Sequence, residues 1–89
     1  MRVNFNQGET RHVKLKIINK KDEPFSITSA QYELTPMYGS EALEKGQAAI
    51  LDHILDVVIT PPGAGIYKLA YTYIIGDETL VDVVEVHVT

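Results

Sequence analysis

The side chains of this chain that could perform chemistry are three histidines and a small number of carboxylates, and their spacing limits what they can do. His12, His53 and His87 lie far apart, with no i, i+4 pair and no His-x-His pair. Metal ligation would require the fold to bring them together with carboxylates, so we expect histidines on polar strand faces instead. The sequence predicts no metal site.

Carboxylates and glycines also lack a catalytic arrangement. Asp77 and Glu78 follow Gly76 in a segment typical of a polar hairpin turn, and no spaced run of oxygen ligands follows them. The glycines at 63 and 65 precede a predicted strand, so they offer no helix N-terminus to a phosphate. No Ser-His-Asp order or pair of catalytic carboxylates can be assembled. We expect no enzyme activity, no catalytic residue and no cofactor.

Composition excludes several further classes of function. The 89 residues carry a net charge of −4, which weighs against a nucleic-acid partner. Lys14 and Lys16 share one face of a predicted strand and are expected to form a solvated outer face. Without cysteine there is no disulfide, thiol nucleophile or thiolate metal site. The cellular compartment stays open.

The apolar stretches of the sequence are too short to predict a membrane partner. The longest nearly apolar stretch, 54–59, is interrupted by Asp56 and is far shorter than the ~20 residues that span a bilayer. The first six residues contain no apolar signal-peptide segment. We expect a soluble protein, and its length predicts one domain, 1–89.

Period-2 alternation of apolar and polar residues dominates the chain and predicts strands separated by turn residues. Segment 37–46 is the exception, and we expect a loop or one helical turn there. A polar turn is expected at 20–24. The predicted strands are 3–6, 9–19, 27–34, 47–51, 53–60, 65–73 and 79–88.

This pattern predicts an all-β fold, an immunoglobulin-like antiparallel β-sandwich of about seven strands. Tyr67 follows a Pro-Pro-Gly-Ala-Gly corner and is the candidate corner tyrosine, with its hydroxyl bonded back to the backbone near that turn. Ile17, Tyr32 and Leu69 are expected to meet at the centre of the core. A five-stranded oligonucleotide-binding barrel fits poorly, because there are too many strands and few exposed aromatic residues beside basic ones.

Several segments resemble the small immunoglobulin-like modules of bacteriophage tail and baseplate proteins. These modules begin with a Gly-acid-Thr step, as at 8–10, and continue with a strand and a turn ending in Pro, as at Pro24. They close with Gly-x-Tyr, a long strand, a Gly-containing turn and a valine-rich strand, as at 65–67 and 76–88. The resemblance implies a structural role in a virion or prophage particle and no catalytic residues.

Tyr71, Tyr73 and Asp82 are the residues of the closing hairpin that could relate to function. Both tyrosines lie on the same face as Tyr67 and Leu69, so they either pack in the core, with Tyr73 half exposed, or form a candidate interface. Asp82 lies among apolar neighbours. It either marks a strand edge that resists pairing with other edges, or accepts a bond from a tyrosine or lysine.

We therefore expect a non-enzymatic structural or interaction module with protein partners, self-association among them, in a phage or prophage particle. One alternative is a ligand- or carbohydrate-binding domain of a secreted or surface bacterial protein. Another is an accessory domain of a larger enzyme. Neighbouring genes for tail proteins, an upstream signal peptide or a catalytic domain in the same reading frame would distinguish these three.

Overall fold

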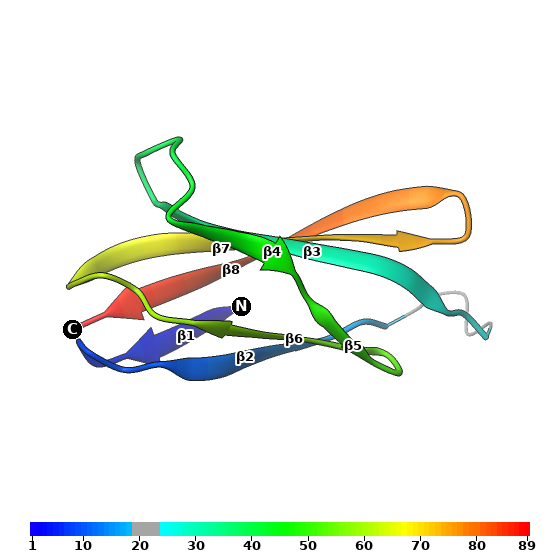
Figure 1. Ribbon diagram of the computed structural model, residues 1–89, viewed down its shortest axis with the longest axis horizontal. Coiled ribbons are helices and arrows are strands. Elements are labelled where there is room, and N and C mark those ends of the chain that lie inside the picture. The colour runs from blue at the N-terminus through cyan, green and yellow to red at the C-terminus, as the bar shows by residue number, and fades with distance from the viewer. Residues whose placement is uncertain (19–23) are drawn as a thin grey trace.

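The computed structural model describes residues 1–18 and 24–89, which form an all-β fold (Figure 1). No helix occurs in this part of the chain. Most of the polar turn predicted at 20–24 lies outside the described residues. The strands are β1 (Arg2–Phe5), β2 (Arg11–Lys16), β3 (Ile27–Pro36), β4 (Glu44–Gln47), β5 (Ala49–Leu51), β6 (Ile54–Ile59), β7 (Gly65–Ile75) and β8 (Glu78–Val88).

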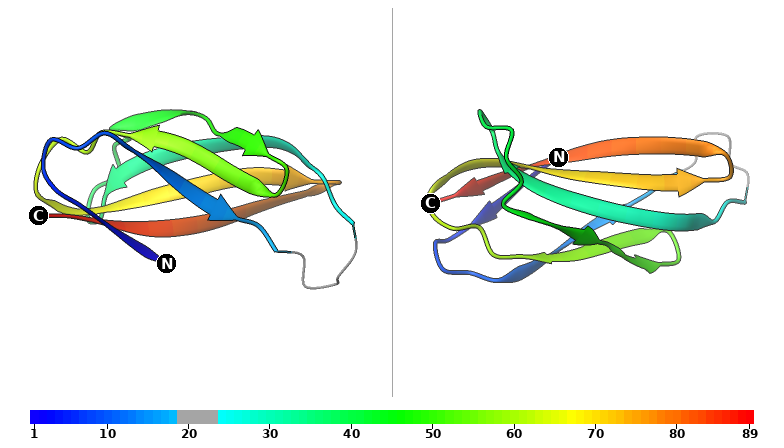
Figure 2. Two further views of the ribbon diagram at one scale, coloured as in Figure 1. Left: turned by 90° about the horizontal axis from the view of Figure 1, so that it is seen from below. Right: turned by 45° about the horizontal axis from the view of Figure 1, so that its top comes forward.

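These strands form two sheets that pack face to face (Figure 2). The larger sheet has five strands in the order β1-β8-β7-β3-β4, and the smaller has three in the order β2-β6-β5. The β7–β8 hairpin extends past the end of the smaller sheet (Figure 1). The larger sheet therefore has one stretch that the second layer does not cover.

One pairing departs from the predicted antiparallel arrangement, because β1 runs parallel to β8. The chain leaves β1 through a turn at Asn6–Gly8 and enters β2, which belongs to the other sheet. Antiparallel neighbours are usually joined by a short hairpin, whereas β1 and β8 are the first and last strands and have no such constraint. The other five strand pairings are antiparallel.

The core lies between the sheets and follows the alternation of the sequence. In β6 the inward residues Leu55, Val57 and Ile59 are buried, as the sequence predicts. On the opposite sheet, Leu34 of β3 and Leu69 of β7 are cross-strand partners, and both are fully buried. Residues from both sheets thus form one continuous hydrophobic cluster.

The predicted central trio of the core is found in part. Ile17 and Leu69 are buried, whereas Tyr32 is only partly buried and packs against the edge of the cluster. Its cross-strand partner on β4, the edge strand of the larger sheet, is Gly46, which has no side chain to cover the ring. Tyr71, the partner of Tyr32 on β7, instead occupies a fully buried position.

The segment predicted as one strand at 47–51 is two strands in different sheets. β4 ends at Gln47 in the larger sheet, and β5 begins at Ala49 in the smaller sheet. Ala48 between them is buried, and its N–H donates to the Ala30 carbonyl at 3.0 Å. The chain crosses here from one sheet to the other, a change that alternation cannot reveal. Of the segment 37–46, predicted as a loop or one helical turn, 37–43 is a loop, whereas 44–46 belongs to β4 and pairs with β3.

Tyr67 makes the contact that the sequence predicts for a corner tyrosine. Its ring is buried, and its hydroxyl donates to the Gly63 carbonyl at 2.8 Å. The bond joins the start of β7 to the turn that precedes it, and so fixes the corner between β6 and β7.

Removing this hydroxyl is expected to weaken the corner. The substitution Tyr67→Phe keeps the ring but leaves the Gly63 carbonyl without its donor, so the free energy of unfolding should fall by about 1 kcal/mol. Urea denaturation measures the change. Tyr38→Phe is the matched control, because Tyr38 is 97% exposed on the β3–β4 loop and should cost nothing measurable. Equal stability of the two variants would contradict the corner role.

Candidate protein-binding edge

The three histidines lie at separate places and contact different partners. Nδ1 of His12 is 3.0 Å from Oδ1 of Asp56 on the outer face of the smaller sheet. His53 stacks on Phe25 with 3.9 Å between ring centroids. Nε2 of His87 is 2.7 Å from Oε1 of Glu85. Among the described residues, no group of three or more His, Cys, Asp or Glu side chains could hold a metal ion.

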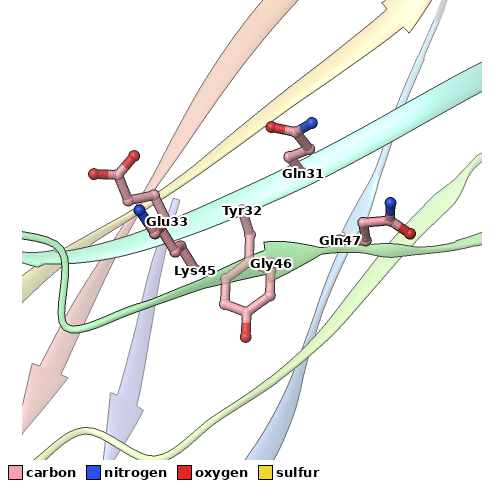
Figure 3. A pocket seen from close by; sticks show the side chains of 6 residues that line it. All are labelled: Gln31, Tyr32, Glu33, Lys45, Gly46 and Gln47. Atoms are coloured by element: carbon pink, nitrogen blue, oxygen red, sulfur yellow. The ribbon is translucent and has the colours of Figure 1, made fainter.

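A shallow hollow of about 400 Å³ lies over β3 and β4 (Figure 3). Its polar side chains come from the cross-strand pairs Gln31–Gln47 and Glu33–Lys45. Tyr32 points to the opposite side of the sheet, as the pleat requires. The hollow is a gap between two polar pairs on an open sheet surface.

The two tyrosines that the sequence offers as a candidate interface lie inside the core. Tyr71 is 0% exposed and Tyr73 is 6% exposed, so the half-exposed position predicted for Tyr73 is wrong. The Tyr71 hydroxyl crosses to the other sheet and donates to the Val13 carbonyl at 3.0 Å. The Tyr73 hydroxyl donates to Oδ2 of Asp82 at 2.7 Å. Neither ring offers a surface to a partner in this structure.

The feature of this hairpin that faces outward is an open strand edge. β8 pairs with β7 from Glu78 to Val88, but on its other side β1 covers only Glu85–Val88. The stretch 78–84 therefore has a neighbour on one side only within the described residues. We call it the β8 edge. An unpaired edge of this kind is a template for pairing with another chain.

The backbone groups that the β8 edge presents follow from one hydrogen bond. The Glu85 N–H donates to the Met1 carbonyl at 3.0 Å, so the backbone of Glu85 faces the β1 side. Backbone groups two residues apart point the same way in a strand. The N–H and C=O groups of Thr79, Val81 and Val83 therefore point to the open side, where the described residues provide no neighbouring strand.

Side chains of the β8 edge add an apolar face and a carboxylate. Val81 is 59% exposed and Val83 is 52% exposed on the outer face of the sheet. Asp82 lies on the inner face and is also exposed, with one carboxylate oxygen bonded to Tyr73. The interpretation of Asp82 as an acceptor for a tyrosine is confirmed, whereas its role in resisting pairing with other edges stays a prediction. What the sequence missed is that, among the described residues, β1 pairs only with Glu85–Val88 of β8.

Burial and the bond to Asp82 both affect the acidity of Tyr73. Desolvation, followed by the hydrogen bond and the negative charge of Asp82, raises the pKa of Tyr73 from 10.0 to about 12. Burial and the charge of Asp56 raise the pKa of Tyr71 as well. Both groups stay protonated, as donors, throughout the neutral pH range.

The raised pKa of Tyr73 predicts a loss of stability at alkaline pH. Unfolded tyrosine ionises near pH 10.0, whereas folded Tyr73 ionises near pH 12, so its contribution to stability is complete below pH 10 and is lost between these values. Urea denaturation from pH 9 to 12 should show a smaller decline for Tyr73→Phe than for the wild type. The control Tyr38→Phe should keep the wild-type decline. If the free energy of unfolding of Tyr73→Phe declined with pH as much as that of the wild type, the raised pKa of Tyr73 would be contradicted.

In the described part of the chain, no helix is long and apolar enough to cross a membrane. Comparison with known proteins gives no match for this chain among family models, curated proteins or solved structures.

Proposed function

We propose that this chain is an immunoglobulin-like module that acts by binding other proteins and not by catalysis. The sheet order supports the immunoglobulin-like assignment. In that fold the second strand pairs within one sheet, and the third strand and the last two lie in the other. Here β2 belongs to the smaller sheet, and β3, β7 and β8 belong to the larger. The Tyr67 corner bond supports the same assignment.

The observation that carries the binding role is the β8 edge. It combines outward-facing backbone groups with two half-exposed valines, and hydrogen bonding along an edge is a common way for a sheet to bind an extended peptide. Natural proteins usually cover or shorten such edges. An edge that the described residues leave uncovered, with exposed apolar side chains beside it, therefore favours the interpretation that another protein covers this surface in an assembly.

The setting that we propose is a larger protein assembly of the phage or prophage type. The support for this setting is the resemblance of the opening and closing segments to tail and baseplate modules. In such an assembly the chain would serve as a structural connector, and its partners would be other proteins of the particle or a second copy of itself.

Site-specific photo-cross-linking in the host cell tests the binding role. A photoreactive amino acid replaces Val83 on the β8 edge, and in a second variant it replaces Val58, which is exposed on the smaller sheet. We expect an adduct of defined mass from position 83 that position 58 does not give. Val81→Pro should remove the adduct, because it deletes an N–H that faces the partner while leaving the ladder with β7 intact.

Two outcomes would contradict the proposal. The same adducts from positions 83 and 58 would indicate random collisions, and no adduct from position 83 would indicate that the edge stays uncovered. Circular dichroism of Val81→Pro must show the wild-type spectrum for the comparison to count. Mass spectrometry of the adduct identifies the partner and shows whether it is a second copy of the chain.

A further inference from the structure

We propose that the β8 edge selects an extended segment of another protein that carries a lysine or arginine beside Asp82 and apolar side chains beside Val81 and Val83. This inference rests on the proposed binding role and specifies the chemistry of the partner. The evidence is the position of the Asp82 carboxylate between the two exposed valines of this edge.

The pleat of β8 fixes which side chains of an added strand meet which residues. Val81 and Val83 lie on the outer face and are about half exposed, so apolar side chains placed beside them would bury this surface. Asp82 lies between them in the sequence and points to the inner face. An added strand must therefore place its intervening residue beside the Asp82 carboxylate.

The charge of Asp82 decides which type of residue the added strand can place beside it. Its carboxylate is exposed in the free protein, and the hydroxyl of Tyr73 occupies only Oδ2. A strand laid beside it would remove water from the carboxylate, and an apolar neighbour would leave the charge without compensation. A lysine or arginine supplies an opposite charge and donors for the remaining oxygen.

Nearby acidic side chains strengthen this preference. Asp77 and Glu78 are exposed where the hairpin enters β8, and the whole chain carries a net charge of −4. All three carboxylates lie within a few residues of one another, so a basic segment is attracted to this stretch and an acidic one is repelled.

Pairing of the β8 edge with the same edge of a second copy is disfavoured for this reason. The two edges would bring two Asp82 carboxylates and two Glu78 carboxylates onto one strip of the joined sheet. Like charges on neighbouring strands destabilise a sheet. The partner that fits is therefore a different, basic segment.

A tethered strand tests the preference directly. The chain before β1 would run along the β8 edge if it continued in the direction of β1, because Arg2 pairs with Glu85 and the strands are parallel. By this register the second residue before Met1 lies beside Asp82, and its two neighbours lie beside Val83 and Val81. We compare two proteins that each carry a six-residue extension before Met1. The extensions have valines beside Val83 and Val81 and differ only in the residue beside Asp82, which is lysine in one and glutamate in the other.

Amide hydrogen exchange at Thr79, Val81 and Val83, measured by NMR, reports pairing. We expect the lysine extension to slow exchange at these amides by about tenfold more than the glutamate extension. In Asp82→Asn most of the difference should disappear, because asparagine can still accept the Tyr73 bond but has no charge, and only the weaker attraction of Asp77 and Glu78 remains. The wild-type spectrum elsewhere shows that each variant is folded.

The alternative outcomes separate the two proposals. Equal protection by both extensions would overturn the charge preference and leave the edge as a binding surface. Protection by neither extension would overturn the charge preference, and with it the β8 edge as a site for an added strand. A lysine preference of undiminished size in Asp82→Asn would assign the selectivity to other acidic residues and overturn the role of Asp82.

Discussion

Replacing Tyr71 with alanine is expected to lower the free energy of unfolding by about 3–5 kcal/mol, a large part of the stability of a domain of this size. Tyr71 is fully buried between the sheets, and its hydroxyl is bonded to the Val13 carbonyl of the opposite sheet. The substitution removes the ring, leaves a cavity and deprives that carbonyl of a donor. Urea denaturation followed by circular dichroism measures the loss.

The variant Tyr71→Phe separates packing from hydrogen bonding. It keeps the ring and removes only the hydroxyl, so we expect a smaller loss of about 1–2 kcal/mol. If Tyr71→Ala is too unstable to fold, Tyr71→Phe still tests the bond between the sheets. A Tyr71→Phe protein as stable as the wild type would show that this bond contributes nothing to joining the sheets.

Leu69→Ala should cost about 2–5 kcal/mol, because it opens a cavity in the middle of the larger sheet. Leu69 is fully buried, and its cross-strand partners Leu34 and Val84 are buried on either side. These three residues form one continuous row, which can close around a missing side chain only by moving strands. The measurement is again the free energy of unfolding in urea.

Val83→Ala is the matched control for Leu69→Ala. Val83 lies on β8 next to Val84 but faces outward and is half exposed, so its truncation should change stability by less than about 0.5 kcal/mol. Similar losses in the two variants would contradict the assignment of inner and outer faces in the larger sheet.

Much of the fold follows from local rules that act over a few residues. The inward side of β6 is predictable because side chains alternate with a period of two, and Leu55, Val57 and Ile59 are accordingly buried. The corner at Tyr67 is predictable because a Pro-Pro-Gly turn leaves a carbonyl within reach of the next buried tyrosine. Both features depend on neighbours along the chain.

The features that were mispredicted depend on distant parts of the chain. At Ala48 the chain passes from the larger sheet to the smaller one, and the Ala48 N–H is bonded to the Ala30 carbonyl of β3. Nothing in the residues at 47–51 indicates this distant contact. Tyr73 is buried although it lies toward the end of a long strand, because it belongs to the hydrophobic cluster that residues of both sheets form. Within the described residues, β1 reaches only Glu85–Val88 of β8, a parallel pairing between the first and last strands that local patterns do not indicate.

The account of function depends on this last feature, since the residues that the sequence offers as a contact patch are inside the core. Both tyrosines are buried in the core, and the Tyr73 hydroxyl holds the Asp82 carboxylate in place. The neighbouring backbone and valines form the surface that we propose for binding. The hairpin thus combines a buried interior with the edge that we propose as the binding surface.

Residue-resolved amide exchange, on the free protein and on the protein bound to the partner that cross-linking identifies, tests the central claim most directly. In the free protein the amides of Thr79, Val81 and Val83 should exchange rapidly, and those of Leu80 and Val84, which face β7, should exchange slowly. In the complex all of them should exchange slowly. Slow exchange at Val81 and Val83 in the free protein, or rapid exchange there in the complex, would contradict the assignment of the β8 edge as the binding surface.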